Sequence, residues 1–290
     1  MKKTIGEPII DELKICYVAS TELLTSLTDT AKGDSYDFSD IIAYRTTSIH
    51  FKYAYDICIG SMDCRRKIAS IRFGRYGDSE ETNFIFYRIE NYVLYNHELF
   101  KQAMAIPQLL NLTFHNFTSL DIAIDQQYDV AHLIKRLYRR KDITTIINGK
   151  AIKDRKETLK NLYLTYSTSL DRLKSLSVNI KQKKALHDKT RGITVQAYNK
   201  MNEIQDVSHK QYICEFYGFP NRLYRLEVHL NNAEIKDYCN KYGIHQDESM
   251  ISDQELLSTM FFYHLSSVIR FTKGRTKLYW TDILKNNGRV

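Results

Sequence analysis

Arg191-Gly-Ile-Thr-Val-Gln-Ala-Tyr-Asn-Lys200 is the stretch around which the rest of the chain is organised. Its side chains alternate between apolar and polar in the order Ile193, Thr194, Val195, Gln196, Ala197 and Tyr198. A period of two predicts a β-strand with one buried face. Tyr198 falls on the polar face at the end of this strand, with Lys200 two positions further on and Glu203 close by. A phenol in this place can either cap a core or attack an electrophile.

Two further predicted strands carry polar groups on one face. In the segment 119–125, Asp121 and Asp125 point one way, separated only by Ala123, and apolar residues point the other. Two carboxylates so arranged repel each other unless a cation or a base lies over them. The segment 223–230 places three polar side chains on a single face: Arg225, Glu227 and His229.

The remaining pattern predicts an α+β fold with antiparallel sheets flanked by helices. Residues 41–95 are rich in β-branched and aromatic residues separated by short turns, which favours antiparallel pairing. Residues 31–40 are expected to form a polar loop, and a helix is expected to end near Pro107. Strands are also predicted at 143–147, 159–166 and 176–180. Helices are predicted to open at residues suited to N-capping: Ser20, Asn96, Asp129, Asn232 and Ser252.

The chain of 290 residues is long enough for one large domain or two small ones. We expect an N-terminal α+β half at 1–110, a catalytic and DNA-binding half at 111–245, and a C-terminal helix with a basic tail at 246–290, or a single compact domain. The sequence has no apolar run long enough to span a bilayer and no signal core near its start. Its five cysteines are scattered. These features predict a cytoplasmic protein that does not bind membranes.

Positive charge is concentrated in one block. Residues 131–200 hold 18 Lys and Arg against 5 Asp and Glu, a net charge of +13, whereas the whole chain carries +8. Such a local excess is expected of a protein that binds a phosphate backbone, the alternative being a solvated basic surface without a partner. The predicted DNA contacts are Lys135, Arg136, Arg139, Arg140, Lys181, Lys183, Lys184, Arg191 and Arg225.

The three polar strand faces would form a nest of carboxylates and imidazole beside a phenol if the strands are neighbours. Oxygen ligands with one imidazole suit Mg²⁺ or Mn²⁺, and the candidate ligands are Asp121, Glu227, Asp125 and His229. The ion would draw charge from a phosphodiester oxygen. A phenol with a free pKa of about 10 also needs a cation, such as the metal or Lys200, to become a nucleophile near pH 7.

Each of these assignments has a structural alternative. Glu227 and Arg225 could form only an ion pair, and His229 could be an ordinary strand histidine. Asp121 and Asp125 could flank a turn or cap the following helix. Tyr198 is one of 21 tyrosines.

Three segments together resemble the Rep_trans-type replication initiation factors, the rolling-circle initiators of plasmids and phages. Leu120-Asp-Ile-Ala-Ile-Asp125 resembles the family's Asp-bearing strand. Ala197-Tyr-Asn-Lys200, followed by Glu203, resembles its tyrosine motif, and Tyr224-Arg-Leu-Glu-Val228 its Arg-Leu-Glu strand. The order and spacing agree over roughly residues 110–240.

The resemblance implies a relaxase-like fold and a site-specific DNA nickase. Tyr198 would attack an origin phosphate and stay linked to the 5′ end, and the freed 3′-OH would prime a host polymerase, with a host helicase as a further partner. Asp121 and Glu227 would hold the divalent ion, and the family suggests a homodimer. The chain departs from the family at Ser119, where arginine is common, and at Lys181, where glycine is usual. The His-x-His metal motif of the better-known relaxases is absent.

Two hypotheses follow from the sequence. The first is a metal-dependent nicking and closing enzyme that initiates replication on double- and single-stranded origin DNA. The second is a non-catalytic origin-binding initiator or repressor that uses only the basic block. A hydroxyl of Tyr198 within reach of a site shared by Asp121 and Glu227 would favour the enzyme, and a Tyr198 ring buried in the core would favour the non-catalytic binder.

Overall fold

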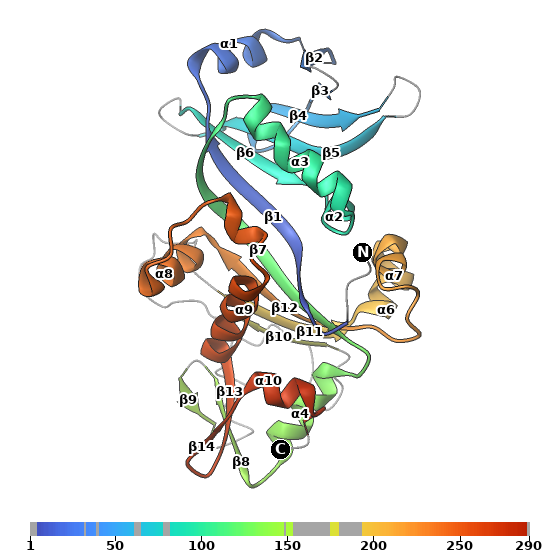
Figure 1. Ribbon diagram of the computed structural model, residues 1–290, viewed down its shortest axis with the longest axis vertical. Helices are drawn as coiled ribbons and strands as arrows, with labels where there is room; N and C mark the ends of the chain where they lie inside the picture. Colours follow the sequence, from blue (N-terminus) through green and yellow to red (C-terminus); the bar gives the residue numbers. More distant parts are fainter. Residues whose placement is uncertain are drawn as a thin grey trace. The chain divides into compact units, whose positions relative to one another are not determined.

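The computed structural model describes residues 5–31, 33–38, 41–60, 65–77, 82–147, 149–152, 175–179 and 193–288. They form antiparallel β-structure flanked by helices, which confirms the predicted α+β class (Figure 1). None of the helices in this described part combines the length and the apolar character needed to span a bilayer. The chain divides into two compact units, the first mainly Asp11–Leu120 and the second mainly Asp121–His245 with Ser249–Val290. The expected boundaries at 110 and 245 stay a prediction.

The described strands form two sheets. The larger runs in the order β10 (Ser175–Asn179), β11 (Thr194–Asn199), β12 (Tyr224–Asn231), β7 (Thr113–Gln126), β1 (Pro8–Val18), β6 (Phe84–Ile89), β5 (Arg66–Arg75), β4 (Phe51–Ile59), β3 (Ile41–Thr46) and β2 (Ser35–Phe38). The smaller runs in the order β14 (Thr276–Leu278), β13 (Ile269–Lys273), β8 (Ile143–Ile147) and β9 (Lys150–Ala151).

In the first unit, helices cover one face of the sheet. Helix α3 (His97–Leu109) lies across β5 and β6, and Tyr87 of β6 donates a hydrogen bond to the carbonyl oxygen of Ala103 at 2.7 Å (Figure 1). On β4, Tyr55 donates to the carbonyl oxygen of Leu27 in helix α1 (Thr21–Asp29). The short helix α2 (Asn91–Leu94) precedes α3. Both tyrosines are buried, together with apolar side chains two positions away on the same face of their strands, such as Ile57 and Ile85.

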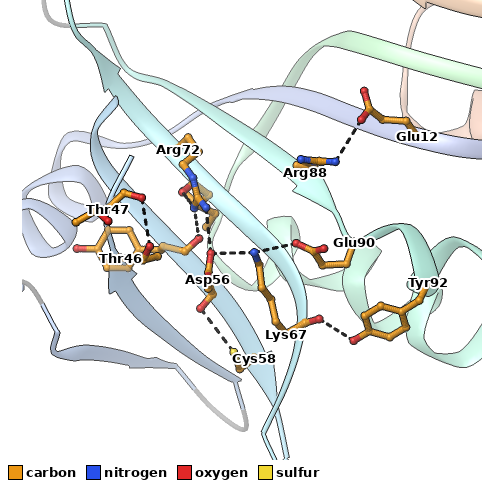
Figure 2. Close-up of polar contacts among 12 residues, drawn as sticks. Glu12, Thr46, Thr47, Asp56, Cys58, Lys67, Arg72, Arg88, Glu90 and Tyr92 are labelled. Atoms are coloured by element: carbon orange, nitrogen blue, oxygen red, sulfur yellow. Dashed lines mark hydrogen bonds and ion pairs between the residues drawn. The ribbon is translucent and has the colours of Figure 1, made fainter. Parts of the chain in front are cut away.

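The opposite face of this sheet carries a ladder of ion pairs (Figure 2). Asp56 accepts from Arg72 at 3.0 Å and lies 3.2 Å from Lys67 Nζ, which in turn lies 2.9 Å from Glu90. The guanidinium of Arg88 lies 3.3 Å from Glu12. Lys67, Arg72 and Arg88 are thus each matched by a carboxylate, as is common on a solvated structural surface.

In the second unit, the core lies on the apolar face of β11 and β12. Val195, Ala197, Leu226 and Val228 are fully buried, and α4 (Val130–Arg139) packs against both strands. Helices α8 (Asn232–Tyr242) and α9 (Gln254–Val268) also pack against β12. The other described elements of the unit are α6 (Lys200–Glu203), the π-helix η2 (Ile204–Ser208), α7 (Gln211–Phe216), the 3-10 helix η3 (Glu248–Ile251) and α10 (Trp280–Lys285).

Most predicted helix starts agree with the structure. The side chains of Ser20, Asn96 and Asp129 each accept the backbone N–H three positions on. Helix α8 begins at Asn232 as predicted, with Asn231 as its cap, whereas the predicted cap of α9 is displaced by one residue from Ser252 to Asp253. Asparagine and aspartate are both good side-chain acceptors at this position.

One prediction in the first unit is wrong. The polar loop expected at 31–40 contains strand β2, whose residues pair with β3. Helix α3 ends near Pro107 as predicted, but it continues through the proline to Leu109. Proline has no N–H to give to the carbonyl oxygen of Ala103, and the hydroxyl of Tyr87 takes that place. The strand predicted at 159–166 lies outside the described residues, and the one predicted at 176–180 is observed as β10.

Candidate active site

The polar residues of β11 and β12 share one face of the sheet. The two strands are antiparallel, with Tyr198 opposite Arg225, Gln196 opposite Glu227 and Thr194 opposite His229. The residues between them along each strand are buried in the core. The alternation read from the sequence therefore places the candidate phenol, acid and imidazole on the same surface.

Tyr198 and Glu227 are in direct contact. The hydroxyl of Tyr198 donates a hydrogen bond to Oε2 of Glu227 at 3.0 Å. Glu227 is a diagonal neighbour of Tyr198 across the strand pair, a separation that long side chains can span. Both side chains are only partly buried. A carboxylate at this distance can accept the phenolic proton.

Asp121 and His229 form a second contact on this face. Nδ1 of His229 meets Oδ1 of Asp121, which joins β12 to the neighbouring β7. The imidazole is 40% exposed and the carboxylate is 15% exposed. The contact orients the ring while leaving much of it accessible.

Asp125 and Arg225 form a third contact, which is enclosed. Nε and Nη2 of Arg225 donate to Oδ1 and Oδ2 of Asp125 at 2.8 and 2.7 Å, and both side chains are 0% exposed. Arg225 was predicted to contact DNA and Asp125 to bind metal. The structure instead pairs them with each other in the protein interior, where neither is placed to meet a ligand from solvent. A bidentate pair of this kind holds β7 and β12 in register.

The two contacts between β7 and β12 also locate Glu227. Asp121 contacts His229, and Asp125 contacts Arg225. The two contacts are four residues apart along each strand, and the two strands run in opposite directions. Glu227 therefore lies midway between the two contacts, at the level of Ala123. Glu227 therefore has Tyr198 on its β11 side and Ala123, rather than another acid, on its β7 side.

Lys200 lies two positions after Tyr198, as the first residue of α6 directly after β11. It is buried, and its Nζ lies 2.8 Å from Oε2 of Glu203 and 5.6 Å from the centre of the Tyr198 ring. The preceding Asn199 caps α6 by accepting the N–H of Asn202 at 3.0 Å, which turns the chain at this point. The turn places an ammonium group close to the aromatic ring of Tyr198.

The candidate metal ligands lie in the three contacts described above. Among the described residues, no group of three or more His, Cys, Asp or Glu side chains is placed to hold an ion. Asp121 contacts His229, Glu227 contacts Tyr198, and Asp125 is enclosed with Arg225. These contacts do not test the expected ion, which stays a prediction.

The predicted DNA contacts of the basic block are described only on α4. Its apolar side is buried, and Arg136 and Arg139 are exposed on the other side beside the partly buried Lys135. Arg140 pairs with Asp142 at 2.6 Å. Lys181, Lys183, Lys184 and Arg191 lie outside the described residues.

Two residues that the sequence reasoning did not single out belong to the same face. Gln196 lies opposite Glu227, and Thr194 lies opposite His229. The period of two that predicted the strand also places both residues beside Tyr198, so the signal was present in the alternation itself.

Comparison with known proteins gives distant structural similarity only. No protein-family model and no curated protein matches the chain. A solved structure of a rolling circle replication initiator protein from Geobacillus stearothermophilus is similar at 13% identity over 97% of this chain and 96% of that chain, with a TM-score of 0.44. Methanococcus jannaschii TBP is similar at 6% identity over 87% and 99%, with a TM-score of 0.29. Both scores are below 0.5, so neither similarity decides the function.

Proposed function

We propose that this protein initiates rolling-circle DNA replication by nicking and closing origin DNA through Tyr198. The observation that carries the proposal is the 3.0 Å hydrogen bond from the hydroxyl of Tyr198 to Glu227 on an accessible face of the sheet. It supplies the paired nucleophile and base that phosphodiester transfer by a phenol requires. The resemblance of the three motif segments to the Rep_trans-type initiators supports the choice of DNA as substrate.

The proposed reaction is an in-line displacement at phosphorus. Glu227 accepts the proton of Tyr198 as the phenolic oxygen attacks the scissile phosphate. A bond forms between this oxygen and phosphorus, and the bond from phosphorus to the 3′ oxygen breaks. The 3′ oxygen leaves and takes a proton from water, which leaves a 5′-phosphotyrosyl link and a free 3′-OH. Attack by a 3′-OH on the link reverses these steps and closes the strand.

Neighbouring groups support this reaction in two ways. The ammonium group of Lys200, 5.6 Å from the ring of Tyr198, favours the negative charge that develops on the phenol. The pairing of β11 with β12 keeps Glu227 at its distance from Tyr198, and the Asp125–Arg225 pair anchors β12 to β7 on its other side. The catalytic residues of the proposal are therefore Tyr198 as the nucleophile, Glu227 as the base and Lys200 as the cation that stabilises the phenolate.

The Mg²⁺ or Mn²⁺ ion expected from the sequence remains a proposal. The described side chains do not gather as a metal centre, so no step of the reaction above passes through an ion. Asp121 and His229 are the pair best exposed to receive one. Isothermal titration calorimetry with Mn²⁺, which compares the affinity of the wild type with that of Asp121→Asn, tests this assignment. Equal affinity in the two proteins would remove Asp121 from the site.

The partners in this proposal are double- and single-stranded origin DNA, a host helicase, a host polymerase and a second copy of the chain. The exposed basic residues of α4 would contact the DNA backbone. Neutralised phosphates release counterions, so binding is expected to weaken steeply as salt is added.

The decisive experiment uses supercoiled DNA that carries the replicon from which the gene comes, with Mg²⁺ or Mn²⁺ supplied. The wild-type protein should produce open circles with protein attached covalently to the 5′ end. Tyr198→Phe should bind the DNA but leave it supercoiled. Tyr279→Phe, the same change at an exposed tyrosine of the same unit, is the matched control and should nick normally. Normal nicking by Tyr198→Phe would disprove the proposal.

A second candidate function is a non-catalytic initiator or repressor that binds origin DNA. It is favoured by α4, which presents exposed basic residues that require no contribution from Tyr198. Under this alternative, wild type and Tyr198→Phe would bind origin DNA equally and neither would produce open circles or covalent product at any metal concentration.

A further inference from the structure

The connection between β11 and β12 is unusually elaborate for two neighbouring antiparallel strands. It leaves β11 after Asn199 and returns at Tyr224, which is paired with Asn199. The N–H of Met201 also bonds to the carbonyl oxygen of Leu223 at 3.0 Å, so both ends of the connection lie at the end of the strand pair that carries Tyr198. Between them stand α6, η2 and α7, which Figure 1 shows beside the ends of β11 and β12.

Phe219 in this connection is both exposed and conformationally unusual. Its side chain is 68% exposed, and its φ is 59°, in the left-handed region that bulky residues rarely adopt. Among the described residues, the other non-glycine residues with positive φ are Asn111, Asn287 and His209, whose types adopt it more readily. Neither the backbone nor the core therefore accounts for a phenylalanine at this position.

The turn around Phe219 is nevertheless well defined. The N–H of Phe219 bonds to the carbonyl oxygen of Cys214 at 2.7 Å, and the N–H of Gly218 bonds to that of Glu215 at 3.0 Å. Cys214 is buried, and Pro220 restricts the chain after the turn. The ring is thus held outward by a fixed backbone, as expected of a recognition residue that must lose little freedom on binding.

We infer that Phe219 is a stacking contact for a base of single-stranded DNA beside the phosphate that Tyr198 attacks. The inference rests on the proposed function. Phe219 belongs to the connection whose two ends lie beside Tyr198, and an exposed aromatic ring can stack on any base, because every base presents a π-face. The exposed Arg222, three residues on, adds a cation for an adjoining phosphate. An unpaired strand fits this contact, since a base in a duplex is already stacked on both sides.

The test compares binding of a fluorescent oligo(dT) 20-mer with that of a duplex of equal length, measured by anisotropy. Phe219→Asn removes the ring and keeps a residue that tolerates positive φ, so folding is preserved. It should weaken oligo(dT) binding about 5- to 100-fold and leave duplex binding within about twofold. Phe219→Tyr keeps an aromatic ring and should bind oligo(dT) as the wild type does. Val207→Ala is the matched control, because Val207 is 74% exposed in the same connection but is not aromatic.

Three results would overturn the inference. The first is that Phe219→Asn binds oligo(dT) as tightly as the wild type does. The second is that Phe219→Asn weakens binding of oligo(dT) and of duplex equally. The third is that Phe219→Tyr binds oligo(dT) as weakly as Phe219→Asn does. Sedimentation of the wild type and Phe219→Asn adds a fourth, because a dimer lost only in the variant would assign the ring to a contact between copies. Failure of the proposed function is distinguishable, since it appears as absent cleavage by wild type while oligo(dT) binding still depends on Phe219.

Discussion

Asp125 and Arg225 lie 100 positions apart in the chain and form a bidentate ion pair that is closed to solvent, with distances of 2.8 and 2.7 Å. Charges in an interior are stabilised by their partner and by hydrogen bonds, and removal of one leaves the other uncompensated. The pair is thus a structural requirement of the strand that presents Glu227.

Arg225→Met is expected to lower the free energy of unfolding by about 3–5 kcal/mol, because Asp125 would keep its buried charge without a partner. Urea unfolding monitored by circular dichroism measures this loss. Arg140→Met is the control, since its pair with Asp142 lies at the surface, and no measurable change is expected there. An Arg225→Met protein as stable as the wild type would show that the pair does not support the sheet.

Glu227→Gln is expected to slow nicking about 10²- to 10⁴-fold under single-turnover conditions, because the amide can still contact Tyr198 but cannot take its proton. Binding of origin DNA, followed separately by anisotropy, should stay the same. Glu215→Gln changes an exposed acid on α7 in the same way and should leave the rate unaltered. Equal rates for Glu227→Gln and wild type would exclude Glu227 as the base.

His264 on α9 should make the protein less stable in acid. The imidazole is buried against the rings of Tyr238 and Tyr263, and burial lowers the pKa of His264 from 6.5 to about 4. The folded state therefore disfavours the protonated ring, so stability falls as the pH drops below 6.5 and the loss is complete below about 4. The total loss is roughly 3 kcal/mol.

The measurement for His264 is the free energy of unfolding between pH 3.5 and 7. His264→Phe keeps an aromatic side chain and removes the titrating group, so its profile should be flatter over this interval. A variant profile parallel to that of the wild type would place the acid sensitivity elsewhere.

Tyr87→Phe is expected to cost about 1–3 kcal/mol of stability, because the carbonyl oxygen of Ala103 would lose its donor inside the core. The cost should shrink in a Pro107→Ala background, where the N–H of the new alanine can bond to the same carbonyl oxygen. A double-mutant cycle on thermal or urea unfolding measures this coupling. Additive effects of the two changes would mean that the hydroxyl and the proline are independent.

Alternation of residue types was sufficient to predict the faces of the site strands. Ile193, Val195 and Ala197 are buried as expected, and Tyr198 and Glu227 lie on the opposite face. Caps such as Ser20 and Asp129 were equally visible, because capping depends on residues only three positions apart.

Partners across strands were not predictable from periodicity. The period of two placed Asp125 and Arg225 on polar faces but did not reveal that β7 and β12 are neighbours in a register that pairs them. The continuation of α3 through Pro107 depends on a donor from β6, 20 positions earlier, and the local sequence favours termination instead. Contacts between residues far apart in the sequence thus determine the strand register and the length of α3, which residue periodicity and local helix preferences do not.

The phenol of Tyr87 and the ring of Pro107 also constrain the history of this chain. If a proline had arisen at position 107 in an ancestor without the tyrosine, the carbonyl oxygen of Ala103 would have been left in the interior without a hydrogen-bond donor. The tyrosine alone would have competed with a helical amide and done no harm. A lineage that acquired the tyrosine before the proline would therefore have kept a donor for this carbonyl group at every step.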